Sequence, residues 1–216
     1  MKGPGTARRT LCHNSRDSRS ARLTPELLRL AYAQGYFPMP HPDTGEILWF
    51  NPDPRAMIPL DGFHVSKSLA RTLKRGAFRT TINQDFRAVM QGCADREETW
   101  ITEEFFEVYG AMHDLGLAHS IEVWHGPQLV GGTYGVSLGG GFFAESMFHT
   151  ENDASKVALH TLVHHMRQRG MTLLEVQFLT PHLQSLGAIE VPQSAYLKLL
   201  QKALSQKETF AEPKVL

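Results

Sequence analysis

The order of helical and strand-like segments predicts an α+β protein, with a small N-terminal α/β domain followed by a larger domain built on a mixed sheet. In residues 23–62 one helical stretch precedes short apolar runs set between proline-rich turns. From residue 63 the chain reads as helices, then three consecutive strand-like runs, then a long helix and a further strand. Such an order is typical of α+β domains. A chain of 216 residues is long enough for this two-part arrangement.

The N-terminal domain is expected over residues 23–62. Thr24 predicts a helix N-cap with Pro25 at the first helical position, and Gly35 ends the helix. Prolines punctuate the next segment, which we therefore expect to be a turn. The expected elements are a helix at 25–34, a turn at 37–43, a strand at 47–50, a turn at 51–55 and a strand at 56–60.

The larger domain is expected over residues 63–216. Thr102 and Gly116 bracket one of its helices, and His125-Gly126-Pro127 separates two apolar runs as a hairpin turn would. In chain order, the expected elements are a helix at 66–75, a strand at 80–82, helices at 85–93 and 103–115, strands at 118–124, 128–138 and 141–147, a helix at 154–169, a strand at 173–178, and helices at 181–186 and 195–204.

Residues 1–22 carry Lys2, five arginines and a single acid, Asp17, without any apolar core. They are expected to form a basic flexible tail, not a secretion signal. An RNA-attracting arm and an organelle transit peptide are the alternatives. The whole chain has 22 Lys+Arg and 22 Asp+Glu, so any RNA contact must come from a local patch. No apolar run approaches the roughly 18 residues of a membrane span.

Nothing in the sequence calls for a metal or another cofactor. Cys12 and Cys93 stand far apart, without the spacing of a disulfide framework or a zinc site, and fit a reducing cytoplasm. His160 and His164 have helical i, i+4 spacing, but no acid follows His160 as a zinc-protease motif requires. The glycines before Phe142 match no phosphate-binding loop, and a hairpin turn is expected there.

Two acidic side chains stand out because they interrupt apolar strands. Glu145 lies in the apolar run 141–148, where a carboxylate is costly unless it is paired or works chemically. Glu175 and Gln177 alternate with apolar residues and so share one strand face. The pair could bond each other, orient an attacking amine or help remove its proton. A solvent-facing polar stripe is the alternative.

Two further features suit RNA. Trp100 precedes a capped helix, where its ring either packs between elements or stacks on a base. A cluster of five basic residues indicates either a solvated helix face or a phosphate-binding patch. The cluster consists of Lys67, Arg71, Lys74, Arg75 and Arg79.

Nine segments, in order along residues 23–201, resemble the motifs of leucyl/phenylalanyl-tRNA–protein transferases. They are AYAQGYFP at 31–38, LWFNPDPRA at 48–56, HVSKSL at 64–69, TWIT at 99–102, HSIEVW at 119–124, LVGGTYGV at 129–136, ESMF at 145–148, DASK at 153–156 and SLGAIEVP at 185–192. Each is weak alone, but nine in one order make chance an inadequate explanation.

This resemblance implies both a fold and an activity. The larger domain would be similar to N-acetyltransferases. The enzyme would move Leu or Phe, and Met less well, from aminoacyl-tRNA to the N-terminal amine of proteins that begin with Arg or Lys, which marks them for degradation. The resemblance implies no cofactor and no metal. We expect a monomer that works in the cytoplasm and not on a membrane.

The resemblance also assigns the catalytic residues. Glu175 and Gln177 match an Asp-x-Gln pair that either relays a proton or only orients the substrate. Glu at position 175 departs from the usual Asp and moves the carboxylate by about one bond length, a shift that can cost rate. Met39 stands where a tryptophan is common, and Thr133 where a pocket methionine can occur.

The remaining matches concern three parts of the charged tRNA: its terminal adenosine, its acceptor stem and the aminoacyl side chain. Tyr32 and Trp100 match residues that grip the terminal adenosine. The matches to the basic cluster that binds the acceptor stem are Lys74, Arg75 and Arg79. The matches to the pocket for the aminoacyl side chain are Phe142, Glu145, Met147, Leu159, Leu174 and Thr133.

Two alternative functions stay open. A small-molecule N-acyltransferase would need a pyrophosphate-binding loop of the type Q/R-x-x-G-x-G/A entering a helix, and none precedes Ala154. A non-catalytic tRNA-binding or degradation-adaptor protein is compatible with the departure at Glu175. Such a protein would bind charged tRNA without transferring its amino acid.

Overall fold

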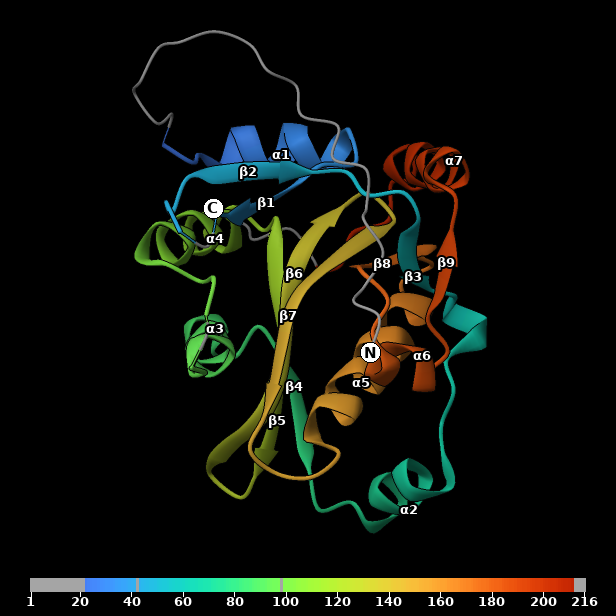
Figure 1. Cartoon of the computed structure of the whole chain (residues 1–216). Helices are drawn as coiled ribbons and strands as arrows, with labels where there is room; N and C mark the ends of the chain where they lie inside the picture. Colours follow the sequence, from blue (N-terminus) through green and yellow to red (C-terminus); the bar gives the residue numbers. More distant parts are fainter. Residues whose placement is uncertain (1–21, 42, 98, 212–216) are drawn as a thin grey trace, which may run out of the picture.

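The computed structural model describes residues 22–41, 43–97 and 99–211 (Figure 1). The expected basic tail, residues 1–22, therefore lies outside the described residues except for Arg22. The strands are β1 (Phe37–Pro40), β2 (Ile47–Phe50), β3 (Arg55–Ile58), β4 (Arg79–Ile82), β5 (Ala118–His125), β6 (Gln128–Leu138), β7 (Gly141–His149), β8 (Leu173–Gln177) and β9 (Ile189–Val191).

A seven-stranded mixed sheet organises the larger part of the chain. Its order is β4-β5-β6-β7-β8-β3-β9, and β1 and β2 form a separate two-stranded sheet. Only β7 and β8 are parallel, whereas the other neighbours are antiparallel. Parallel neighbours need a long crossover, which the helix at 154–168 supplies. The prediction of a mixed α+β fold is confirmed.

Helices cover both faces of this sheet, as the placement of α3 and α5 shows in Figure 1. One apolar cluster, here called the α1 face, takes residues from α1 (Pro25–Ala33), α3 (Phe86–Ala94), α4 (Glu103–Asp114) and α7 (Gln193–Leu204). The other, the α5 face, takes residues from α2 (Lys67–Arg75), α5 (Ala154–Gln168) and α6 (Pro181–Ser185). Among the described residues, no helix is long and apolar enough to span a bilayer.

Two adjacent glycines let helices approach β6 from both faces. A Cβ on Gly131 would lie 2.7 Å from the Ala154 side chain of α5, and one on Gly132 would lie 3.1 Å from Val89 of α3. Cβ atoms essentially never show the first distance, and the second is tighter than most of their contacts, so glycine here lets the layers pack closely.

Most helices begin within one residue of the predicted position. The side-chain oxygens of Thr24, Ser66, Asp85 and Thr180 each accept the backbone N–H three residues later, as N-caps do. Thr102 occupies the N-cap position of α4 without such a side-chain bond.

Three strands differ from the sequence prediction. Residues 37–40, expected within a turn, form β1, because prolines are tolerated in a short edge strand that pairs on one side only. β3 was assigned to the small N-terminal unit, but it lies in the large sheet between β8 and β9, and it begins at Arg55, which was expected in a turn. β9 was not predicted, because three residues carry too little periodicity. The domain boundary at residue 62 stays a prediction.

Gly135 offers a test of how tightly β6 and β7 pack. A Cβ there would lie 2.2 Å from the Phe143 carbonyl oxygen and 2.6 Å from the Phe142 ring. We expect Gly135→Ala to lower the free energy of unfolding by about 1–3 kcal/mol or more. The control, Gly110→Ala in α4, meets nothing within 4 Å and should gain about 0.5–1 kcal/mol. Urea unfolding measures both, and equal midpoints would contradict the packing argument.

Candidate functional site

The site lies where β7 and β8 stop pairing, here called the β7–β8 fork. The parallel pairing runs only from Gly141 and Leu173 to Phe143 and Glu175. Beyond that point β7 continues to His149, while β8 ends at Gln177. Past the last paired residues the two strands separate. Glu145 of β7 and Gln177 of β8 lie in this unpaired part, where their side chains meet.

Glu145 lies at a β-bulge in β7. Tyr134 of β6 is opposite Ser146 and Gly135 is opposite Ala144, so Glu145 is the extra residue between them. Such an insertion changes the alternation of the strand. Phe142 and Ala144 belong to the α5 face, and Glu145 points to the opposite face, as regular alternation requires. The extra residue changes the faces that follow, so Met147 packs on the α5 face.

Three donors surround the Glu145 carboxylate, whose residue is only 8% exposed. The Tyr32 hydroxyl donates to Oε1 at 2.6 Å, and the Gln177 side-chain amide donates to the same oxygen at 3.2 Å. The Tyr109 hydroxyl donates to Oε2 at 3.1 Å. Since each carboxylate oxygen has two lone pairs, Oε1 is saturated and Oε2 has one acceptor position left.

The contacts among Tyr32, Tyr109 and Glu145 need one more hydrogen than the two tyrosine hydroxyl groups supply. The two hydroxyl oxygens also lie 2.7 Å from each other, which makes three oxygen–oxygen contacts for two hydroxyl hydrogens. When Glu145 is ionised, both hydroxyls donate to it and their mutual contact lacks a hydrogen; when Glu145 holds a proton, that proton supplies the third hydrogen. Burial raises the pKa of Glu145 to about 7, although the hydrogen bond from Tyr32 lowers it. The group can therefore exchange a proton near neutral pH.

Both tyrosines serve as neutral donors. Burial, followed by the charge of Glu145, raises the pKa of Tyr32 and of Tyr109 well above the ordinary value. Tyr32 is fully buried, with its ring 5.4 Å from that of Phe143. The structure therefore brings Tyr32 to Glu145 through its hydroxyl and leaves no ring face exposed.

Glu175 is bonded to the backbone of Gln177 and is paired with a cation. Its Oε1 accepts the Arg55 Nε–H at 2.7 Å, and both side chains have zero exposure. Burial raises the pKa of Glu175, and the charge of Arg55 opposes that rise. Because a guanidinium stays protonated in proteins, we regard the pair as ionic. This carboxylate therefore joins Arg55 of β3 to the end of β8.

Gln177 links the two carboxylates. Its backbone N–H donates to Glu175 Oε1 at 2.6 Å while its side chain reaches Glu145. Its φ of 63° is in the left-handed region, which side-chain-bearing residues adopt at some energetic cost and often at functional sites. Glu175 and Gln177 were predicted to share a face, and they do meet, but through a backbone bond.

Four of the six residues expected to line an aminoacyl pocket lie on the α5 face, whereas Glu145 points to the α1 face. Phe142, Leu159 and Leu174 are fully buried there, and Met147 packs against them. Thr133 on β6 donates its hydroxyl to the Ser146 carbonyl oxygen at 2.9 Å. Their function as one pocket stays a prediction.

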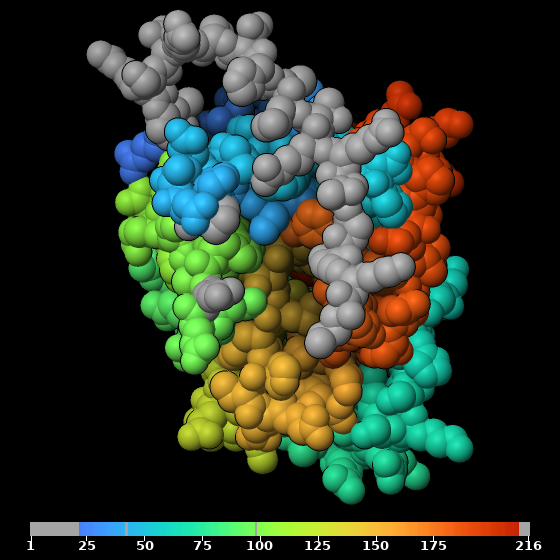
Figure 2. Space-filling view, viewed as in Figure 1, coloured from blue at the N-terminus to red at the C-terminus, as the bar shows by residue number. Residues whose placement is uncertain are grey.

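Trp100 packs against the α1 face, where Phe105 lies between its ring and that of Tyr109, whereas the basic residues are on α2 and β4. Trp100 is half-buried and its ring stands edge-on to Phe105 at 5.2 Å. Lys74 and Arg75 end α2, and Arg79 begins β4, all three being exposed. Figure 2 shows the α2 segment (teal) projecting from the body of the molecule.

Sequence reasoning missed two members of the site, Arg55 and Tyr109. Arg55 lay within a quoted motif but was expected in a turn, where an arginine is ordinarily solvated. Tyr109 is one of several aromatic residues on the apolar side of α4, and nothing in its spacing separates it from a core residue.

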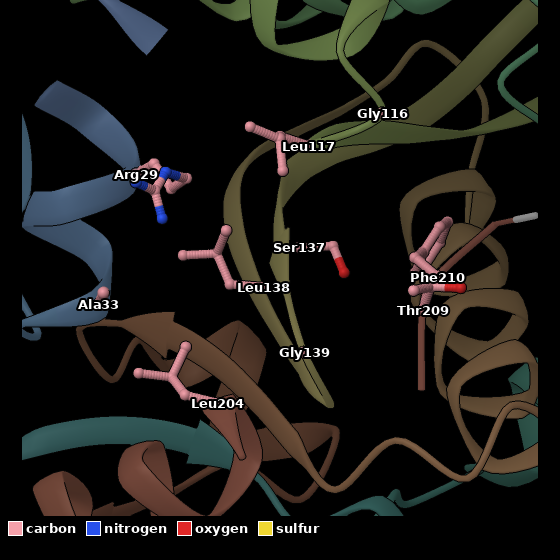
Figure 3. A pocket seen from close by; sticks show the side chains of 10 residues that line it. All are labelled: Arg29, Ala33, Gly116, Leu117, Ser137, Leu138, Gly139, Leu204, Thr209 and Phe210. Carbon is pink, nitrogen blue, oxygen red and sulfur yellow. The ribbon is translucent and has the colours of Figure 1, made fainter. Parts of the chain in front are cut away.

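A cavity of about 350 Å³ opens elsewhere, at the turn between β6 and β7 (Figure 3). Arg29 and Ala33 of α1 line one side of it, and Thr209 and Phe210 the other. It includes neither Glu145 nor Gln177 among its lining residues. The polar groups that converge at the fork therefore lie outside this cavity.

The sequence is similar to a well-populated family. A family model described as leucyl/phenylalanyl-tRNA protein transferase matches residues 57–201, and the model of its N-terminal domain matches residues 21–53. Leucyl/phenylalanyl-tRNA–protein transferases from Herpetosiphon aurantiacus and Rubrobacter xylanophilus are 52% and 50% identical to this chain. Each alignment covers 88% of this chain, with 98% of the first relative and 100% of the second.

A further relative of that name, from Cereibacter sphaeroides, is 53% identical over 88% of this chain and 90% of its own length. Among solved structures, L-PGS from Bacillus licheniformis aligns with a TM-score of 0.40 and 14% identity. That alignment covers 74% of this chain but only 55% of that one.

The raised pKa of Glu145 can be tested through stability. Between the ordinary value of 4.5 and about 7, the folded protein holds a proton that the unfolded chain releases. The free energy of unfolding should therefore fall as pH rises through this window. Glu145→Gln lacks this titration, so wild type should lose stability relative to the variant from pH 4.5 to 7. Urea unfolding at several pH values measures the difference, and parallel curves would refute it.

Proposed function

The chain belongs to the leucyl/phenylalanyl-tRNA–protein transferase family, and from this premise we propose that it transfers Leu or Phe from aminoacyl-tRNA to the N-terminal amine of another protein. The observation that best supports this chemistry at the fork is the carboxylate of Glu145, held by three donors with one acceptor position left. An attacking amine must lose a proton, and this oxygen is placed to take it.

The reaction needs no oxidant and no activated co-reactant. The amine nitrogen attacks the carbonyl carbon of the aminoacyl ester, a C–N bond forms, and the C–O bond to the tRNA ribose breaks. The amine proton passes to Glu145 Oε2 and then to the departing ribose oxygen, which leaves as a hydroxyl. Because the ester is already activated, holding the two substrates together supplies much of the rate.

We propose that Glu175 and Gln177 act in catalysis as a pair that orients the reacting groups. Gln177 donates to Glu145, and Glu175 fixes the backbone of Gln177. Glu175 pairs with Arg55 and is fully buried, which argues against a direct proton relay through it. The longer side chain at this position, compared with Asp, is compatible with that supporting role.

The other assignments continue as proposals from the resemblance. An apolar pocket of Phe142, Met147, Leu159, Leu174 and Thr133 would select the aminoacyl side chain by size, with a flexible methionine accommodating Leu, Phe and less readily Met. Tyr32 and Trp100 would contact the terminal adenosine, for which Tyr32 would have to expose its ring. The acceptor-stem contacts would be Lys74, Arg75 and Arg79.

We propose further that the acceptor proteins begin with Arg or Lys and that the transfer marks them for degradation. A monomer and a cytoplasmic location stay predictions of the sequence. Among the described residues, no three His, Cys, Asp or Glu side chains gather as a metal site would require.

The activity itself is tested with radiolabelled leucyl-tRNA and a protein bearing N-terminal Arg. We expect label in the product, and none in a matched protein bearing N-terminal Gly. If the purified chain binds charged tRNA but transfers no label, the enzyme assignment fails and the non-catalytic adaptor takes its place. Equal labelling of both acceptors would remove the Arg/Lys rule while leaving the activity.

The role of Glu145 is tested with Glu145→Gln, which keeps the shape but cannot accept the proton. We expect kcat to fall about 100-fold or more. The same loss should occur with a leucyl-tRNA analogue that carries a hydroxyl group in place of the α-amino group. A loss confined to the natural substrate would mean that Glu145 only holds that amino group. Glu190→Gln, an exposed carboxylate on β9, is the matched control and should retain wild-type kcat.

A further inference from the structure

Arg55 is a fully buried arginine at the start of β3. Its guanidinium carbon lies 4.7 Å from the ring centroid of Phe37 and 4.6 Å from that of Tyr196. Removing such a charge from water is costly, and apolar replacements of buried ion pairs are often as stable or more so. Stability alone therefore gives a weak reason for an arginine at this position.

Two chains of contacts, here called arms, connect Arg55 to Glu145. The first arm runs through β8. Its Nε–H donates to Glu175 Oε1 at 2.7 Å, and the same oxygen accepts the Gln177 backbone N–H at 2.6 Å. This second bond holds Gln177 at its φ of 63°. In that conformation the Gln177 amide reaches Glu145 Oε1 at 3.2 Å.

The second arm runs through the end of α1. Arg55 Nη1–H donates to the Gly35 carbonyl oxygen at 2.9 Å, and the Gly35 N–H donates to the Tyr32 carbonyl oxygen at 3.0 Å. Gly35 has a φ of 83°, which suits glycine and ends the helix. The Tyr32 hydroxyl then donates to Glu145 Oε1 at 2.6 Å.

The two arms therefore end on the same oxygen atom. We propose that Arg55 is a positioning residue of the transfer reaction: it places the Tyr32 and Gln177 donors on Glu145 Oε1 and so leaves Oε2 as the oxygen that receives the proton. The inference rests on the proposed function, since it names the residue that orients the base. Arg55 touches neither the substrate nor Glu145 itself.

Neutralising both partners separates positioning from simple loss of charge balance. Arg55→Met alone would leave Glu175 buried without its cation, so the informative protein is the double variant Arg55→Met/Glu175→Gln. We expect it to fold, with kcat about 100-fold below wild type because the donors are misplaced. The KM for leucyl-tRNA should stay within about threefold, since the residue makes no substrate contact.

The matched control is Arg167→Met/Asp61→Asn, the same pair of changes in an exposed ion pair, and it should keep wild-type kcat. If the double variant does not fold, Arg55→Lys keeps a cation beside Glu175 and cannot also reach Gly35. In that variant kcat should fall about tenfold, because one arm remains. A folded double variant or Arg55→Lys protein with wild-type kcat would overturn the proposal.

A crystal structure of the double variant, or of Arg55→Lys if the double variant does not fold, gives a readout that does not depend on activity. We expect the Gln177 amide or the Tyr32 hydroxyl to have left Glu145 Oε1. Retention of both contacts would overturn the positioning inference even if the wild-type protein proved inactive. Conversely, an inactive wild type with displaced donors in the variant would defeat the transferase proposal alone.

Discussion

The buried ion pair of Arg55 and Glu175 is the interaction on which the site depends. It joins β3 to β8, fixes the end of α1 through Gly35, and lies between rings contributed by β1 and α7. Elements from both ends of the chain therefore meet around one cation. Because an unpaired charge in this position would be strongly destabilising, the pair permits one relative arrangement of these elements and excludes others.

Two irregularities of the sheet lie where the Glu145 carboxylate meets the Gln177 amide. Glu145 is the extra residue of a bulge in β7, and Gln177 has a left-handed backbone conformation at the end of β8. The parallel pairing ends at this level, so the irregular backbone does not break a continuous ladder.

Burial and hydrogen bonding shift the pKa of Glu145 in opposite directions, and their balance sets the pH at which the group exchanges a proton. Burial raises the pKa, while hydrogen bonds from Tyr32, Tyr109 and Gln177 lower it, which leaves a value of about 7. A more exposed carboxylate would hold a proton too weakly, and one buried without donors would not give it up. The basic residues at the end of α2 and the start of β4 lie outside this group.

The sequence by itself determined the elements whose causes are local. Thr24, Ser66 and Asp85 are caps that act within one helical turn, and a carboxylate in an apolar strand marked Glu145 as unusual before any contact was known. The nine motifs gave the family, since their order is written along the chain. Tertiary structure alone decided that β3 joins the large sheet, that the Glu145 carboxylate and the Gln177 amide meet across the fork, and that Arg55 and Tyr109 belong to the site. These contacts join residues 32–120 positions apart. The energies of the bulge, the left-handed turn and the buried cation depend on neighbours that no local pattern specifies.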